Sequence, residues 1–276
     1  MAKIAVIGIC GKSTFMYVDH FHGKGETLSA TSVFEEMGGK GINQAIAAAR
    51  QGAQVSFLCA VGEDDAGKKC AQLLEDEGIK ACVKVKKGEN TTMAVILTDK
   101  EGENRVTVFR DAELSAEDVK DFEVEIASSD ILLLQNEVPE QVNSEAVKIA
   151  EKYGVKVILN PAPPRENVPE NLFMVTPNEQ EKAFINPGKY QNCITTLGGD
   201  GCDINGEIHI PAMPAEVVDT TGAGDTFNGV LAVKIAEGTE LAEAAKYAVA
   251  ASSISVSRKY VIDSIPTKEE TERKFL

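Results

Sequence analysis

The chain has 276 residues with 28 basic and 43 acidic side chains, which gives a formal net charge of −15. Nucleic acids and anionic membranes attract basic surfaces, so this charge argues against both as partners. No apolar run approaches the ~18 residues that a membrane span requires. The six cysteines include no C-x-x-C pair, and they indicate buried free thiols in a cytoplasmic protein rather than disulfides or zinc ligands.

Strand-like and helix-like segments alternate along most of the chain. We expect strands at residues 3–9, 55–61, 131–135, 155–159 and 174–176. Expected helices cover residues 41–50, 66–77, 140–153, 224–236 and 241–257, and a polar tail follows the last of them. This alternation predicts an α/β fold with a mostly parallel sheet flanked by helices, in one domain over residues 1–276.

Two segments interrupt the alternation, at residues 15–36 and 91–110. Both contain short β-rich runs separated by polar turns, so they predict paired strands. We assign residues 14–37 and 91–111 to a small β lid inserted into the α/β body. Further along, Asn205-Gly206 predicts a hairpin with a type I′ turn.

The strongest chemical signal is the sequence VVDTTGAGDTFNG at residues 217–229. A strand end runs through a glycine-rich turn into a helix, so unpaired backbone N–H groups gather where an anion such as phosphate binds. Gly222 and Gly224 let the backbone approach that anion closely. Asp225 places a carboxylate beside it, where it can accept a proton from an attacking hydroxyl. The alternative is an ordinary helix cap, which does not require this many small residues.

Three further polar motifs accompany this turn. In NEQE, Asn178 and Glu181 share one face of a helical turn and suit a hydrated Mg²⁺, although a helix cap explains the same pattern. TTLGGDG at residues 195–201 suits a nucleotide's phosphates or sugar, or else a plain hairpin turn. In GGKGINQA at residues 38–45, glycines open a helix and project Lys40 and Asn43 toward sugar hydroxyls or an anion.

Two other patterns resemble known binding motifs only in part. GKST at residues 11–14 matches the end of a P-loop, but the opening glycine would have to stand at position 6, which is Val6. DHFH at residues 19–22 lacks further zinc ligands, since His209 is the only other histidine, so we expect an exposed lid edge or a substrate contact there rather than a metal site.

The motifs GGKGINQA, NEQE, TLGGDG and DTTGAGDTFNG, in this order, resemble those of the ribokinase-like (PfkB) carbohydrate kinase family. The resemblance extends over almost the whole chain. It implies a Rossmann-like body with a β lid, and transfer of the γ-phosphoryl group of ATP to a hydroxyl of a sugar-like molecule. Asp225 then corresponds to the catalytic base, with the backbone of Gly222, Ala223 and Gly224 as the anion hole.

The resemblance also implies the other ligand sites. The acceptor side comprises Gly39, Lys40, Asn43 and Glu137, with Ser13 in the turn after the first strand. The nucleotide side comprises Asn178, Thr196, Gly198 and Gly201. Mg²⁺ is expected near Asn178 and Glu181 through water, and a monovalent cation such as K⁺ near Asp219, Thr221 and Ser264. Because family members often pair through the lid, we also expect a homodimer.

The chain departs from the family pattern in two places. Gly11 and Ser13 stand where ribokinases carry an Asn and an Asp that bind the sugar hydroxyls, so D-ribose is expected to be a poor substrate. Only about a dozen residues, 182–193, separate NEQE from the next strand, and the family normally has another helix between these two elements. Two alternatives therefore stay open: a ligand-sensing relative without turnover, and a nucleoside or phosphosugar kinase of the same fold. For the phosphosugar, Lys12, Lys40, Arg105 and Arg110 would have to cluster in space.

Overall fold

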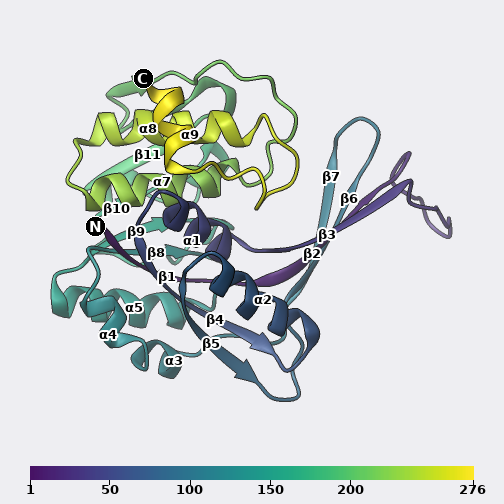
Figure 1. Cartoon of the computed structure of the whole chain (residues 1–276), viewed down its shortest axis with the longest axis horizontal. Helices are drawn as coiled ribbons and strands as arrows, with labels where there is room; N and C mark the ends of the chain where they lie inside the picture. The colour runs from purple at the N-terminus through teal and green to yellow at the C-terminus, as the bar shows by residue number, and fades with distance from the viewer.

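The computed structural model describes residues 1–276, and a nine-stranded sheet forms its centre (Figure 1). Across the sheet the strands are β13 (Ile208–Ile210), β12 (Cys202–Ile204), β11 (Asn192–Thr196), β10 (Met174–Val175), β9 (Lys156–Asn160), β8 (Ile131–Gln135), β1 (Lys3–Ile7), β4 (Gln54–Gly62) and β5 (Lys80–Lys86). All neighbours from β11 to β5 are parallel, whereas β12 and β13 add an antiparallel hairpin at one edge. The predicted parallel sheet is confirmed.

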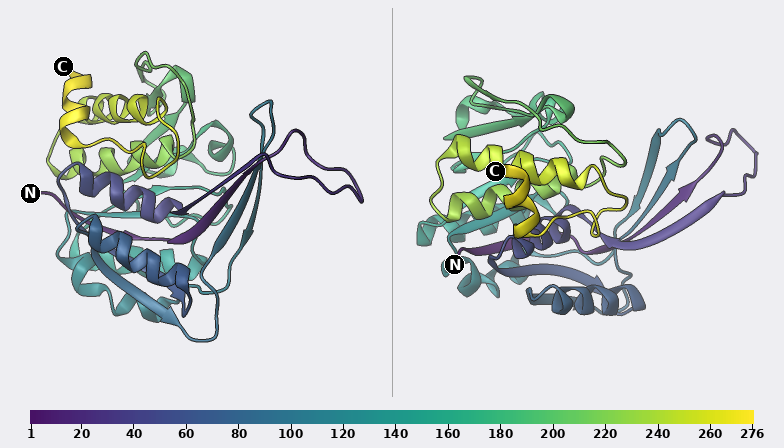
Figure 2. Two further views of the ribbon diagram at one scale, coloured as in Figure 1. Left: turned by 45° about the vertical axis from the view of Figure 1, so that its right-hand side comes forward. Right: turned by 45° about the horizontal axis from the view of Figure 1, so that its top comes forward.

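Helices cover both faces of this sheet (Figures 1 and 2). One face carries α1 (Lys40–Arg50), α2 (Asp65–Asp76), α7 (Ala223–Ala236) and α8 (Leu241–Ser255), and the other carries α3 (Ala116–Lys120), α4 (Glu123–Ala127) and α5 (Glu140–Tyr153). Strand β1 shows why: Ile4 and Val6 enter the first core, whereas Ala5 and Ile7 enter the second. A strand buried on both sides must be apolar throughout, which explains its continuous hydrophobic run.

A second sheet of four strands projects from one side of the body (Figure 1). Its order is β3 (Ser32–Gly38), β2 (Gly11–Tyr17), β6 (Met93–Thr98) and β7 (Asn104–Phe109). Strand β2 pairs antiparallel with β3 and parallel with β6, and β6 pairs antiparallel with β7. The paired strands predicted for residues 15–36 and 91–110 are confirmed, and the fold is the Rossmann-like body with a small second sheet that the motifs implied. The lid function of residues 14–37 and 91–111 stays a prediction.

Most predicted elements end within two residues of their observed bounds. The hairpin turn also agrees, since Asn205 and Gly206 have φ of 55° and 72°, and a type I′ turn needs positive φ at both positions. The segment 182–193 holds only the end of the short helix α6 (Glu179–Lys182) and a 3₁₀ turn (Pro187–Lys189) before β11 begins.

The predicted polar tail is wrong, because the chain ends in helix α9 (Lys268–Phe275). Thr267 and Glu270 form a capping box that satisfies backbone donors at the start of the helix. The ring centroid of Phe275 lies 5.2 Å from that of Tyr247 on α8. Buried Thr271 also accepts a hydrogen bond from Gln51, and Arg258 pairs with Glu270. The cap and these tertiary contacts order the segment, although its sequence shows little apolar periodicity.

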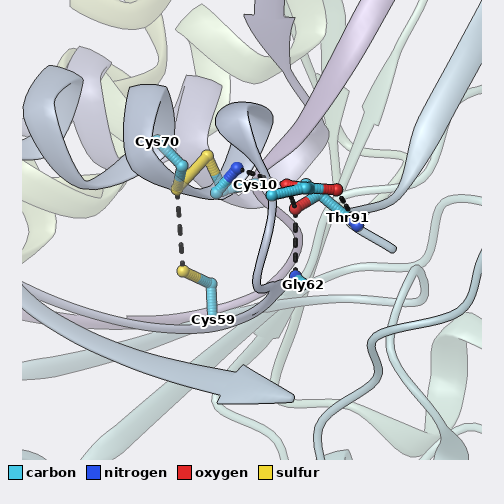
Figure 3. Close-up of a disulfide and its surroundings, with 7 residues drawn as sticks. Cys10, Cys59, Gly62, Cys70 and Thr91 are labelled. Atoms are coloured by element: carbon cyan, nitrogen blue, oxygen red, sulfur yellow. Dashed lines mark hydrogen bonds between the residues drawn. A yellow bond between two sulfur atoms is a disulfide. The ribbon is translucent and has the colours of Figure 1, made fainter. Parts of the chain in front are cut away.

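The expectation of free thiols is wrong for one pair of cysteines. Cys10 and Cys70 form a disulfide with their Cα atoms 6.3 Å apart, within the usual range for such bonds (Figure 3). The Sγ atom of Cys59 lies 4.0 Å from that of Cys70. The two bonded residues are 60 positions apart and meet because α2 packs against β2. The free cysteines are Cys59, Cys82, Cys193 and Cys202.

No helix is both long and apolar enough to cross a membrane. A cytoplasmic location stays a prediction from the sequence.

The capping box of α9 predicts a pH-dependent contribution to stability. The hydrogen bond from Arg258 and those from Thr267 lower the pKa of Glu270 to about 2. A carboxylate whose pKa is lowered by folding stabilises the native state above its unfolded pKa, and this contribution is lost as the pH falls toward the folded value. Glu270→Gln keeps a capping side chain but loses the charge.

We expect Glu270→Gln to lower the free energy of unfolding at pH 7 by about 1–2 kcal/mol, a value reduced for solvent screening. The difference from wild type should shrink as the pH falls from about 4.5 toward 2. Urea denaturation at several pH values measures it, with Glu269→Gln on the same helical turn as the control. A difference that does not depend on pH would contradict the assignment.

Candidate active site

A cleft of about 240 Å³ lies between the second sheet and the N-termini of α1 and α7. Alternate residues of the second sheet, such as Ser13 and Phe15, face it. Most of the predicted acceptor and catalytic residues line it together: Ser13, Gly39, Lys40, Asn43, Glu137, Gly222 and Asp225. Thr221, predicted as a ligand of the monovalent cation, lines it too. The remaining predicted site residues lie outside this lining.

The start of helix α1 forms one wall of the cleft. Gly39 has φ of 117°, and a Cβ there would lie 2.9 Å from the carbonyl oxygen of Ile9, so only glycine fits. The next N–H, that of Lys40, donates to Oε2 of Glu137 at 2.7 Å. Burial raises the pKa of Glu137, and the charge of Asp225 is the main factor that raises the pKa of Lys40. Lys40 therefore stays protonated between two carboxylates.

Asp225 lies in the first turn of α7 and is 6% exposed. Asn43 Nδ2 donates to Oδ2 of Asp225 at 2.8 Å, and Gln44 Nε2 donates to Oδ1 at 3.0 Å. Both donors come from α1, so two helices fix the position of the carboxylate. Each carboxylate oxygen keeps lone pairs beyond these two bonds and can still accept a proton.

Gln44 begins a chain of buried hydrogen bonds that sequence reasoning missed. Its Nε2 also donates to Oδ1 of Asn160 at 3.2 Å, and its Oε1 accepts from Gln135 at 2.7 Å. Asn160 donates onward to the carbonyl of Thr176 at 3.1 Å. The sequence does contain a signal for this network: an amide side chain ends each of the apolar strands β8 and β9. A polar group buried at such a position must find a hydrogen-bond partner.

The turn before α7 presents unpaired backbone donors to the cleft. The N–H groups of Gly222 and Gly224 have no hydrogen-bond partner, whereas that of Ala223 donates to Thr220 at 3.3 Å. Gly222 has φ of 77°, and a Cβ there would lie 2.4 Å from Cγ1 of Val261. Two of the three predicted anion-hole donors are therefore free, and the turn that holds them packs on Val261.

The loop around Val261 is attached to the second sheet through residues that the sequence did not reveal. The carboxylate of Glu36 accepts from the N–H groups of Val261 at 3.2 Å and Ile262 at 3.3 Å. Phe34, on the same strand, stacks on Tyr260 with centroids 3.7 Å apart. Burial raises the pKa of Glu36 despite these bonds. The second sheet is thus linked to the turn that presents the free donors.

The predicted nucleotide and magnesium residues form a separate group at neighbouring strand ends. Asn178 follows β10, and it pairs in an isolated bridge with Thr196 at the end of β11. Asn178 and Glu181 form a reciprocal capping box, with bonds of 2.8 and 2.9 Å. The charge of Glu181 contributes to the raised pKa of Lys40, after the charges of Asp225 and Glu137.

The helix-cap interpretation of the Asn178–Glu181 pair therefore holds geometrically. The hydrogen bonds of this cap leave lone pairs on the carboxylate of Glu181, which are available for a water-mediated contact with a cation. Gly198 and Gly201 lie in and after the 3₁₀ turn Gly198–Asp200. A Cβ on Gly201 would lie 2.1 Å from the carbonyl oxygen of Ile210, so this turn is fixed against the β12–β13 hairpin.

The predicted monovalent-cation residues are held by local bonds. Oδ1 of Asp219 accepts from the N–H of Thr221 at 2.9 Å, and the hydroxyl of Ser264 donates to the carbonyl of Val261 at 2.8 Å. Thr221 lines the cleft, and Ser264 is buried.

The remaining sequence patterns occupy the second sheet. Residues 11–14 belong to strand β2, whose backbone is paired on both sides, so the P-loop interpretation was correctly rejected. His20 contacts Glu26 at 2.9 Å. Of the four cations considered for a phosphosugar, Lys12, Lys40 and Arg110 line the cleft, whereas the Arg105 guanidinium lies over the Phe21 ring at 4.1 Å.

A doubly covered parallel sheet, a buried carboxylate and free N–H groups at one helix start define an α/β protein built for group transfer to a small molecule. The chain belongs to the pfkB family of carbohydrate kinases, whose pattern matches residues 1–268.

Individual relatives cover nearly its full length. Ribokinase from Haemophilus influenzae is 35% identical over 295 residues, covering 97% of this chain and 96% of that protein. Ribokinase from Bacillus subtilis is 34% identical over 291 residues, covering 99% of each. The structure of Arabidopsis thaliana ribokinase complexed with ribose and ATP superposes with a TM-score of 0.88 at 28% identity, covering 100% of this chain and 99% of that one.

We predict that Asp225→Asn abolishes most activity and leaves the fold intact. An amide of the same shape cannot accept the proton, so phosphoryl transfer should fall by about 10²–10⁴-fold. Rotation of the Asn43 amide would let its Oδ1, which has no partner, accept the new N–H. The loss of stability should therefore stay near 1 kcal/mol.

An ADP-release assay and thermal unfolding measure the two effects. Asp76→Asn on the exposed side of α2 is the matched control and should keep full activity. A loss of activity below tenfold would show that the proton acceptor lies elsewhere. A large fall in melting temperature would identify Asp225 as a structural residue.

Proposed function

We propose that this chain is an ATP-dependent kinase that transfers the γ-phosphoryl group to a hydroxyl of a sugar or sugar-like molecule. The observation that supports this best is the Asp225 carboxylate, fixed by Asn43 and Gln44 beside free N–H groups of the α7 turn. Phosphoryl transfer needs mainly positioning and charge stabilisation, and this arrangement supplies both.

In the proposed reaction Asp225 accepts the proton of the acceptor hydroxyl, whose oxygen forms a bond to the γ-phosphorus as the bond to ADP breaks. The N–H groups of Gly222 and Gly224 donate to the oxygens of the phosphoryl group in transit. Lys40 and Asn43 hold acceptor hydroxyls, and Oδ1 of Asn43, buried without a partner, is available for one of them. The second sheet covers the acceptor and excludes water.

The nucleotide is proposed to bind at the ends of β10 and β11, at Asn178, Thr196, Gly198 and Gly201. Oxygen-rich side chains suit Mg²⁺, and Glu181 has free lone pairs, so Asn178 and Glu181 fit a magnesium ion held through water. Bound Mg²⁺ would neutralise charge on the phosphates. Asp219, Thr221 and Ser264 also present oxygen atoms, the donors that a monovalent cation takes.

A ligand-sensing relative without turnover is less well supported, because the carboxylate, its two donors and the free N–H groups are all present. An ADP-release assay with MgATP over sugars, sugar acids, nucleosides and phosphosugars tests the proposal. Turnover with at least one acceptor, lost in Asp225→Asn, is expected. ATP and acceptor binding without turnover would favour the sensor.

We also propose a homodimer through the second sheet. Strand β7 is an edge strand; Val106 and Val108 on it line the cleft, whereas Phe109 lies outside the cleft lining and is exposed. Open edges with exposed apolar side chains tend to pair with another chain. Light scattering after gel filtration measures the mass, and Phe109→Lys should shift it toward the monomer.

Activity should rise with K⁺. A cation near Asp219 and Ser264 would order the turn that carries Gly222, and this turn presents the donors for the phosphoryl group. We expect a higher kcat in KCl than in tetramethylammonium chloride at equal ionic strength. Asp219→Ala should remove the difference. Equal rates in the two salts would contradict the cation assignment.

A further inference from the structure

Glu36 lies on strand β3 of the second sheet and faces the cleft. In the ladder of β2 and β3 it stands directly opposite Ser13, and both residues line the cleft. Residues that stand opposite each other in an antiparallel pair lie on the same face of the sheet. Because the two strands are hydrogen-bonded, a shift of the second sheet over the cleft moves Glu36 and Ser13 together.

The carboxylate of Glu36 holds a loop that belongs to the α/β body. Its Oε1 accepts from the N–H of Val261 at 3.2 Å, and its Oε2 accepts from the N–H of Ile262 at 3.3 Å. Neither N–H group makes a backbone hydrogen bond. Each oxygen of Glu36 therefore serves a different backbone donor, and both donors depend on this one side chain.

Arg50 attaches the same loop to the body. Its Nη1 donates to the carbonyl oxygens of Ile262 at 2.7 Å and Ile265 at 2.8 Å. Its Nε donates to Glu77 at 3.0 Å, so the guanidinium is itself fixed. Arg50 ends helix α1 and does not belong to the second sheet. Glu36 is thus the hydrogen-bonding residue that connects this loop to the second sheet.

The loop has a backbone conformation that needs support from its neighbours. Tyr260 has φ of 69°, in the left-handed region that bulky residues rarely adopt. Such a conformation persists where the surrounding contacts hold it. The ring of Phe34 stacks on that of Tyr260 with centroids 3.7 Å apart, and Glu36 holds the next two N–H groups. Two residues of β3 therefore support this loop.

The loop in turn supports the start of α7. A Cβ on Gly222 would lie 2.4 Å from Cγ1 of Val261, so the loop and the turn are in close contact. The N–H groups of Gly222 and Gly224 have no hydrogen-bond partner. The carboxylate of Asp225, by contrast, is held by two donors from α1. Glu36 thus acts on the free N–H groups of the turn rather than on the carboxylate.

We propose that Glu36 is a positioning residue for phosphoryl transfer. It holds the loop 260–265 against Gly222, so the placement of the phosphoryl-binding N–H groups depends on the second sheet that covers the acceptor. The inference rests on the proposed kinase function and adds a residue to it. Hydrogen-bond donors stabilise a transition state only when they are fixed before the reaction, so a loosened turn should slow the transfer step.

The first test is the kinetics of Glu36→Gln with MgATP and the acceptor that gives the highest kcat/KM in the panel above. Glutamine has one acceptor oxygen, so its amide N–H₂ would face the second backbone N–H. We expect kcat to fall by about tenfold to hundredfold and KM for the acceptor to change by less than about threefold. Glu101→Gln, an exposed residue in the turn between β6 and β7, should leave both unchanged. A change in KM alone would identify Glu36 as an acceptor contact and overturn the inference.

A double-mutant cycle with Val261→Ala tests the route of the effect. This substitution shortens the side chain that contacts Gly222 and keeps the N–H donor to Glu36. If Glu36 acts through Val261, Glu36→Gln should cost less than about threefold in kcat once Val261 is replaced, because the two effects are then not additive. Independent, additive effects would contradict the inference. Phe34→Leu removes the ring on Tyr260 and should also lower kcat, and it decides the question if Glu36→Gln does not fold.

Hydrogen exchange tests the inference without turnover. Amides in residues 218–224 should exchange faster in Glu36→Gln than in the wild type, whereas those of α5 on the other face of the large sheet should not change. Equal exchange of residues 218–224 in the two proteins would overturn the inference and leave the kinase function standing. If the wild type phosphorylates no acceptor, the kinase function fails in this panel, and the exchange comparison alone decides whether Glu36 positions the turn.

Discussion

The close approach of helices α1 and α7 is the constraint on which the site depends. A Cβ on Gly229 would lie 2.5 Å from the carbonyl oxygen of Gln44 and 2.6 Å from Cβ of Ala47, so only glycine allows the two helices to pack at this distance. Because they do, Asn43 and Gln44 reach Asp225 from the neighbouring helix. A larger residue at 229 would separate the carboxylate from both donors and leave a buried charge unpaired, which is costly.

The same packing connects the site to the rest of the sheet. Gln44 accepts a hydrogen bond from Gln135 and donates one to Asn160. These two residues end parallel strands, and Asn160 donates in turn to the carbonyl of Thr176. In a low-dielectric interior these hydrogen bonds hold the amide side chains in place, because each broken bond would leave a further buried group without a partner. The position of the carboxylate is therefore fixed relative to the strand ends where the nucleotide is proposed to bind.

The second sheet contributes to the site in two ways. Its inner face lines the cleft, and its strand β3 supports the turn of α7 through Glu36 and the loop at Val261. A movement of this sheet would therefore be transmitted to the free N–H groups near Gly222. In the proposed function this link would couple the covering of the acceptor to the binding of the phosphoryl group, and it involves residues from both ends of the chain.

The sequence by itself determined the α/β architecture and the centre of the site. Apolar runs and helical spacing with glycine stops are local patterns, so they located most strands and helices, and the glycines around Asp225 marked the turn that presents free N–H groups. Helix α9 was missed because its order comes from a cap and from tertiary contacts of Thr271 and Phe275 rather than from periodicity. Only the tertiary structure decided which distant residues meet: Glu36 with Val261, Gln44 with Asp225, Cys10 with Cys70, and Arg110 with the cleft. Such contacts depend on how helices and sheets pack over separations of 60 to more than 200 residues, and no local pattern encodes that packing.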